Sequence, residues 1–137
     1  MAMISERTAS LDRPSEDFDQ AALDELAASD RNGRVGQTLV SETDRVRVWP
    51  INLQPGERLP FHRHVIDYFW TALTPGRARS RYSDGKVREF EYAPGETRHL
   101  ATGTGDPVTH DLVNIGDAPL SFVTVEFVEG PNKPLPV

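Results

Sequence analysis

The chain has 137 residues, a length that fits one domain and leaves no room for two independent hydrophobic cores. It contains no cysteine, which excludes disulfides and thiolate metal ligands. Its net charge of −6 argues against a nucleic-acid or anionic-membrane surface, because both need a basic footprint. No charge-free stretch is long enough for a transmembrane helix, and the start lacks the apolar run of a secretory signal, so we expect a cytoplasmic protein.

The N-terminal part is expected to contain a frayed tail followed by one helix. Residues 1–14 are expected to be frayed. Within residues 15–30, Phe18, Ala22 and Leu26 recur at every fourth position, acidic residues crowd the first turn, and an Asn-Gly pair then provides a stop signal. This narrow apolar stripe predicts a helix that packs on the outside of the remaining domain or on a neighbouring subunit.

After this helix the sequence changes to short runs rich in Val, Phe, Tyr, Trp and Thr, separated by Pro-Gly, Asp-Gly and Gly-Asp turn signals. Strands this close together, without helices between them, predict a β-sandwich or β-barrel. We therefore expect a tail and helix over residues 1–33, a β-barrel over 34–130 and a C-terminal tail over 131–137. The expected strands are 35–40, 44–53, 60–64, 67–74, 77–83, 86–92, 108–115 and 119–128.

One hairpin can be predicted in register. Its first strand carries alternate arginines from Arg77 to Arg81, and Glu89 and Glu91 follow an Asp-Gly turn. A three-residue loop over 83–85, with the glycine in the left-handed conformation, sets these arginines opposite the glutamates, whereas an even loop would oppose two arginines. The odd loop is therefore preferred. It turns the following side chains toward the interior: Ala78, Ser80, Phe90 and Tyr92.

Histidines provide the candidate chemistry. His62 and His64 are two residues apart in a segment expected to be extended, so both rings project from one face with Cα atoms roughly 7 Å apart. His110 is a candidate third ligand from another strand, and Asp67 offers a carboxylate oxygen. Alone, a His-x-His pair is common at surfaces, and a lone histidine is usually a hydrogen-bonded core or rim residue. Together they predict a site for a divalent transition metal.

These residues fall in patterns that resemble the cupin superfamily. Its first signature begins with Gly, five residues and His-x-His, and its second ends with His, three residues and Asn. The resemblance covers about residues 44–128 and implies an all-β, cupin-type β-barrel (double-stranded β-helix or jelly roll) with one N-terminal helix. The matching positions are 56–64 in the first signature and Gly95, Gly103, His110 and Asn114 in the second.

The match has three departures. Asp67 lies closer to the histidines than the usual Glu ligand, whose positions hold Tyr68 and Phe69. This leaves open whether Asp67 binds the ion directly, through water or not at all. Ala101 replaces an expected proline, and extra residues between 103 and 110 predict a longer loop at the barrel mouth.

The resemblance suggests three functions. The first is a metal-dependent oxygenase acting on a small organic acid or polar metabolite, with Fe(II) favoured over Zn(II), Mn(II) or Ni(II). The second is a non-oxidative isomerase or lyase in which Tyr68, Tyr82 or His99 moves protons. The third is a non-enzymatic cupin that binds a small ligand. The stretch 62–68 is also similar to small bacterial cupins linked to β-alanine breakdown, which implies a catabolic context.

The surroundings of the site can be predicted only coarsely. His99 could replace a ligand, line the pocket or face solvent, and a surface or rim position is preferred. Arg98 or Arg58 could anchor an acidic substrate. We expect a homodimer, because cupins commonly pair through exposed strands. A mostly apolar pocket is expected from the following residues: Phe69, Thr71, Leu73, Tyr82, Phe90 and Tyr92.

Overall fold

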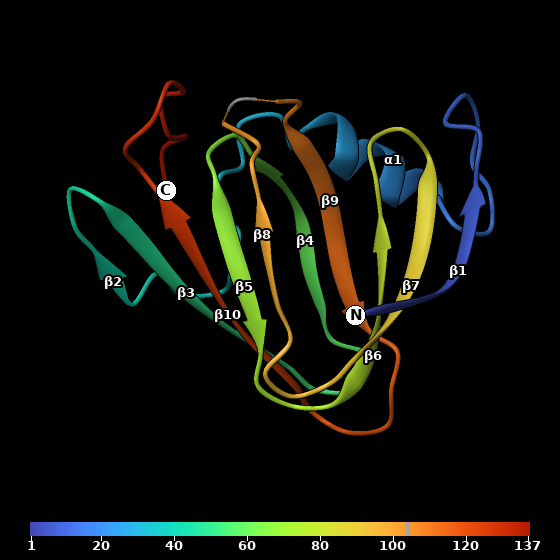
Figure 1. Cartoon of the computed structure of the whole chain (residues 1–137). Helices are drawn as coiled ribbons and strands as arrows, with labels where there is room; N and C mark the ends of the chain where they lie inside the picture. The colour runs from blue at the N-terminus through green and yellow to red at the C-terminus, as the bar shows by residue number, and fades with distance from the viewer. Residues whose placement is uncertain (104) are drawn as a thin grey trace.

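The computed structural model describes residues 1–103 and 105–137 and contains two five-stranded antiparallel sheets that face each other (Figure 1). Sheet A has the strand order β1-β7-β6-β9-β4, and sheet B has the order β2-β3-β10-β5-β8. The elements are β1 (Ala2–Thr8), α1 (Gln20–Ala27), β2 (Ser41–Glu42), β3 (Val46–Leu53), β4 (Arg58–His64), β5 (Tyr68–Ala72), β6 (Gly76–Arg81), β7 (Lys86–Tyr92), β8 (Thr97–Leu100), β9 (Val108–Asn114) and β10 (Leu120–Phe127).

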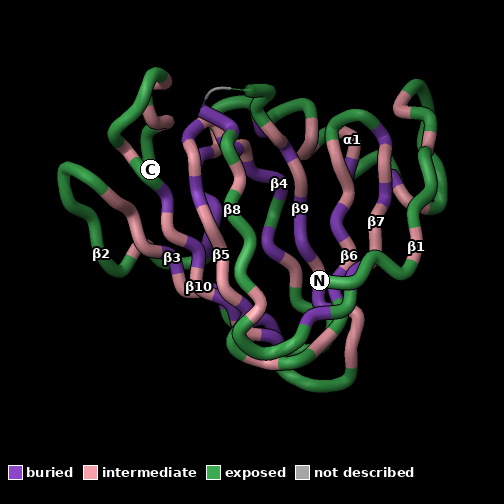
Figure 2. Tube along the Cα trace, in the orientation of Figure 1, coloured by how far each residue is buried: buried purple, intermediate pink, exposed green. Residues whose placement is uncertain are grey.

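The all-β class with a helix near the N-terminus is confirmed. Among the described strands no ladder joins sheet A to sheet B, so the barrel remains open along its edges. The interior between the sheets is filled by a cluster of buried apolar side chains from both, including Leu53, Leu112 and Phe122. Figure 2 shows the buried positions concentrated on the inner strands of both sheets.

The predicted register of the β6–β7 hairpin is confirmed. Arg77 pairs with Glu91 and Arg79 pairs with Glu89, as a three-residue loop requires. Gly85 closes the turn with φ 89°, a left-handed conformation that glycine adopts without a side-chain penalty. The inward side chains are buried as expected: Ala78, Ser80, Phe90 and Tyr92.

The N-terminal tail is not frayed as predicted. Residues 2–8 form β1, which pairs with β7 at the edge of sheet A. Two cross-strand ion pairs accompany this ladder: Arg88 with Glu6 at 2.6 Å, and Arg7 with Glu89 at 3.3 Å. The sequence of β1 lacks a clear alternation because its side chains are mostly exposed.

Other element boundaries also differ from the predictions. Helix α1 starts later than expected because Asp19 caps its N-terminus, with the side chain accepting a hydrogen bond from Ala22 N. Residues 35–40 form no strand, and β8 was not anticipated. In the described part of the chain, no helix has the length and apolar character needed to cross a membrane.

Helix α1 lies against the outer face of sheet A (Figure 1). Phe18 and Ala22 pack there with Phe61 of β4 and Val87 of β7 in a second buried apolar cluster. All three residues of the predicted stripe pack here, but Phe18 precedes the helix and Leu26 is only half-buried. This placement also brings polar residues of the helix close to the backbone of β4.

Candidate metal centre

A β-bulge in β4 sets the orientation of the first histidine. Leu59 pairs with Leu112 and His62 pairs with His110, so two residues of β4 stand opposite one residue of β9. The extra residue reverses the usual alternation of side chains. As a result, Leu59 and His62 both line the interior cavity, while the intervening Phe61 packs toward α1.

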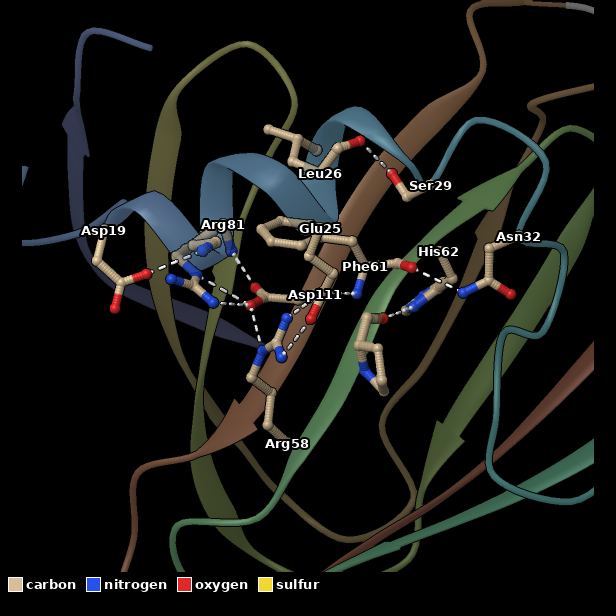
Figure 3. Close-up of polar contacts among 12 residues, drawn as sticks. Asp19, Glu25, Leu26, Ser29, Asn32, Arg58, Phe61, His62, Arg81 and Asp111 are labelled. Atoms are coloured by element: carbon tan, nitrogen blue, oxygen red, sulfur yellow. Dashed lines mark hydrogen bonds and ion pairs between the residues drawn. The ribbon is translucent and has the colours of Figure 1, made fainter. Parts of the chain in front are cut away.

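The backbone groups at this bulge are bonded by residues outside the ladder (Figure 3). Phe61 N donates to Glu25 Oε2 of α1 at 2.9 Å, and Asn32 Nδ2 donates to Phe61 O at 2.8 Å. His62 Nδ1 lies 2.8 Å from Pro60 O and donates its proton to that carbonyl. This bond fixes the tautomer and leaves His62 Nε2 as a free lone pair.

The three predicted histidines meet at one point. His62, His64 and His110 each offer a ring nitrogen, and the three nitrogens lie within 4.8 Å of one another. His64 Nε2 and His110 Nε2 are 3.2 Å apart. Two nitrogens bound to one ion at about 2.0–2.1 Å with bond angles between octahedral and tetrahedral would be about 2.9–3.4 Å apart. The observed spacing therefore fits a shared metal ion.

The imidazoles are held in the neutral state that metal ligation requires. Burial lowers the pKa of His62 to about 4, although the hydrogen bond to Pro60 and the charge of Asp111 partly oppose the change. Burial, followed by the neighbouring imidazoles, lowers the pKa values of His64 and His110 well below the ordinary range. Within the described residues, Nδ1 of His64 and of His110 has no hydrogen-bond partner.

The structure places Asp67 outside this cluster. Its Oδ1 accepts a hydrogen bond from Gly103 N at 2.7 Å, and it lines a separate small depression beside Phe127 and Glu129. Asp67 precedes β5, whose first residue, Tyr68, points inward. Among the described residues, no carboxylate joins the three histidines in a common ligand group. The carboxylate ligand expected from the sequence is thus used to hold the loop at residue 103.

Both tyrosines predicted as proton donors line the cavity. The Tyr68 ring stacks on His64 with centroids 3.9 Å apart, and burial raises its pKa. The Tyr82 ring lies 5.4 Å from the His110 ring, and burial also raises its pKa. Both phenols are therefore protonated at neutral pH.

His99 does not reach the site. It lies on β8 opposite Phe69, and the two rings pack 5.1 Å apart on the outer face of sheet B. The side chains that alternate with it, Arg98 and Leu100, line the cavity instead. The proton-transfer role considered for His99 from the sequence is not supported, whereas the preferred surface position agrees with the structure.

The histidines form part of the wall of a cavity of about 260 Å³ between the two sheets. Its inner face is mostly aromatic and aliphatic, as expected. Phe69, Thr71 and Leu73 were predicted to line it but lie on the opposite face of β5, because Tyr68, Trp70 and Ala72 point inward. The inward face of β5 is shifted by one residue from the prediction because Asp67 points away from the cavity and Tyr68 points into it. Lining residues missed from the sequence include Trp70 and Arg88.

Arg58, one of the two predicted substrate anchors, lies outside the cavity in an ion-pair network behind the histidines (Figure 3). It pairs with Glu25 of α1 and with Asp111 of β9, whose Oδ2 lies 3.0 Å from Arg58 Nε. Asp111 is buried and also accepts hydrogen bonds from the Arg81 backbone and guanidinium. This network ties the helix, β4, β6 and β9 together on the outer face of sheet A.

Comparisons with known proteins give the fold. No protein-family model matches the sequence, and no curated protein matches it either. A cupin domain from Bordetella pertussis Tohama I is 27% identical with a TM-score of 0.58, over 66% of this chain and 88% of that one. An RmlC-like cupin with a double-stranded β-helix fold from Methanocaldococcus jannaschii is 21% identical with a TM-score of 0.51, over 69% and 84%.

A third structure extends the match along the chain. A cupin superfamily protein from Desulfitobacterium hafniense DCB-2 is 15% identical with a TM-score of 0.50, and covers 88% of this chain and 100% of that one. The chain thus has the cupin fold, as its histidine signatures indicated. The three histidines occupy the interior of that fold.

Proposed function

We propose that this cupin-fold protein is a metal-dependent enzyme that acts on a small organic acid or polar metabolite, with an oxygenation at Fe(II) as the favoured reaction. One observation carries the proposal: the neutral imidazoles of two buried histidines and one half-buried histidine converge within 4.8 Å on the wall of a cavity between the two sheets. An open coordination sphere of this kind, with imidazole donors, suits first-row divalent metals. The size of the cavity suits a small molecule.

The chain's own residues would hold the ion and shape its surroundings. His62, His64 and His110 supply the nitrogen ligands, and a bound Fe(II) would offer open positions for substrate and oxygen. The Tyr68 ring, stacked on His64, fixes the orientation of that imidazole. The walls are mostly apolar, and burial of a substrate against them would strengthen electrostatic interactions with the ion.

A non-oxidative isomerase or lyase is the second candidate. It is favoured by Tyr82, a protonated phenol that lines the cavity beside His110, with the Arg88 guanidinium over its ring. Such a group can donate a proton to a substrate bound at the ion. In this case Zn(II) or Mn(II) would suffice, and turnover would not consume oxygen.

The cellular setting is also a proposal. The resemblance of residues 62–68 to cupins linked to β-alanine breakdown supports a catabolic role, and the composition supports a cytoplasmic location. A homodimer is supported by the outer face of sheet B, which the described helix does not cover (Figure 1). Val123, Val125 and Phe127 alternate with buried residues of β10 and present an uncharged surface there.

The test begins with elemental analysis of protein purified without chelators. About one transition-metal ion per chain is expected, and the variants His62→Gln, His64→Gln and His110→Gln should lose it together with turnover. The variant His99→Gln is the matched control, because this histidine lies on the outer face. Oxygen uptake would then separate the two reactions. Full turnover in metal-free protein would contradict both, and tight ligand binding without turnover would favour a binding protein.

A further inference from the structure

The cavity has an unusual distribution of charge. Its lining residues include two arginines and the three histidines but no aspartate or glutamate. Imidazole binds a metal ion as a neutral ligand, so three of them would not reduce the charge of a bound divalent ion. The described lining residues of the cavity therefore favour binding of a negatively charged ligand.

Arg88 is already neutralised. Its Nε lies 2.6 Å from Glu6 Oε2 of β1, and its guanidinium lies over the Tyr82 ring at 5.1 Å from the centroid. The charge of this arginine is used to attach β1 and to orient a phenol. It is therefore a poor candidate for binding an additional anion.

Arg98 is different. It lies on β8, the edge strand of sheet B, and its side chain points to the cavity side. The residue is partly open to solvent, and the ion pairs found among the described residues do not include its guanidinium. Tyr68 of sheet B and Tyr92 of sheet A line the same cavity as Arg98.

The β5–β8 register relates Arg98 to the histidines. Leu100 pairs with Tyr68, whose ring stacks on His64, and Arg98 pairs with Trp70 two positions along the ladder. Two residues of a strand span about 7 Å. The guanidinium and the histidine cluster thus belong to different levels of the same cavity, Arg98 at the level of Trp70 and the histidines at the level of Tyr68 and Leu100.

We infer that Arg98 is the specificity-determining residue of the cavity, and that it binds a carboxylate of a small substrate whose second anionic group binds the metal. The inference rests on the proposed metal centre and narrows its substrate class to compact dianions, with dicarboxylates as the simplest members. A planar guanidinium binds a carboxylate through two parallel hydrogen bonds. A cavity of about 260 Å³ restricts the carbon chain between the two groups to a few atoms.

The test uses binding rather than turnover. The protein is loaded with Zn(II), which is redox-inactive, and titrated calorimetrically with succinate, glutarate and butyrate. Wild-type protein should bind one of the dicarboxylates about 10- to 100-fold more tightly than butyrate, because the second charged contact adds to the first. The variant Arg98→Gln should lose this preference while its zinc content and its affinity for butyrate stay unchanged.

Arg77→Gln is the matched control. It removes the same charge from the exposed outer face of β6 and should retain the wild-type preference. An Arg98→Gln variant that still prefers the dicarboxylates, or a zinc-loaded wild type that binds all three probes equally, would overturn the inference and leave the metal centre intact. A wild-type protein that takes up no zinc would instead overturn the proposed function, which makes the two failures distinguishable.

Discussion

His62 and His110 are paired directly opposite each other in the ladder between β4 and β9. Cross-strand neighbours of this kind have Cβ atoms about 4.5–5.5 Å apart, so the backbone pairing alone brings two imidazoles within reach of one ion. His64 completes the group because it is two residues along the same strand. The metal centre is thus a product of strand register, and anything that fixes this register supports the site.

Glu25 is expected to support the centre from outside. It accepts the Phe61 amide at the bulge and pairs with Arg58, so Glu25→Ala should leave a buried donor without a partner. We expect a loss of about 1–3 kcal/mol in the free energy of unfolding and about tenfold weaker zinc binding. Urea denaturation and a competitive zinc titration would measure both. Asp24→Ala, at an exposed position of the same helix, should change neither. Unaltered zinc affinity in Glu25→Ala would contradict the supporting role.

Glu126 should make stability dependent on pH. Burial raises its pKa from 4.5 to about 7, although Trp49 Nε1 donates to its carboxylate at 2.7 Å. Between these two values the folded state binds the proton more tightly than the unfolded chain, so the free energy of unfolding falls as the pH rises. Glu126→Gln keeps an acceptor for Trp49 but cannot ionise.

This variant should therefore be more stable than the wild type at pH 8, by on the order of 2 kcal/mol, and nearly equal to it at pH 4. Urea denaturation of metal-free protein at the two pH values provides the measurement. The same increment at both pH values would show that ionisation of Glu126 is not the cause.

Two glycines in turns offer a matched pair for testing the contact between β1 and the hairpin. Gly56 and Gly85 have similar positive φ angles of 83° and 89°. An added Cβ would meet open space at Gly56 but would collide with Ala9 O at Gly85. Gly56→Ala should lower the free energy of unfolding by roughly 1–2 kcal/mol, through the strain of the left-handed backbone conformation alone. Gly85→Ala should cost more and release β1 to limited proteolysis, and equal costs for the two variants would refute this contact.

The proposed homodimer can be tested at the outer face of sheet B. Light scattering should give a dimeric mass for the wild type. Val125→Lys places a charge in the middle of the uncharged face and should give a monomer, with an unchanged far-ultraviolet circular dichroism spectrum. A dimer of this variant would show that the chains associate through another surface. A monomeric wild type would contradict the proposed homodimer.

The sequence predicted the parts of the site that depend on local spacing. The His-x-His alternation and the order of the signatures identified His62, His64 and His110, and the charge pattern fixed the β6–β7 register. The His-x-His pair lies within one strand and the charge pattern within one hairpin, so neither depends on how distant segments pack. His110 lies on another strand, and only the order of the second signature indicated it.

Features that depend on tertiary context were not predictable in the same way. Residues 2–8 pair with β7 as an edge strand whose side chains are mostly exposed, so their sequence shows no hydrophobic alternation. Asp67 was considered as a ligand because it lies near the signature in the sequence, yet it points away from the cavity. The proton-transfer role considered for His99 fails for the same reason, although its preferred surface position agrees with the structure. A shift of one residue in the pairing of a strand exchanges the residues that face the interior with those that face outward. For β5 and β8 this register depends on the loops that precede them.

The bulge in β4 has a consequence for reading related sequences. Pro60 and Phe61 separate Leu59 from His62, so deleting either one would bring the aromatic ring or a misplaced imidazole to the wrong side of the strand. Substitutions in this segment can be absorbed, whereas a change in its length cannot. The number of residues between an inward leucine and the first histidine is therefore a simple diagnostic for whether a homologue has retained the metal centre.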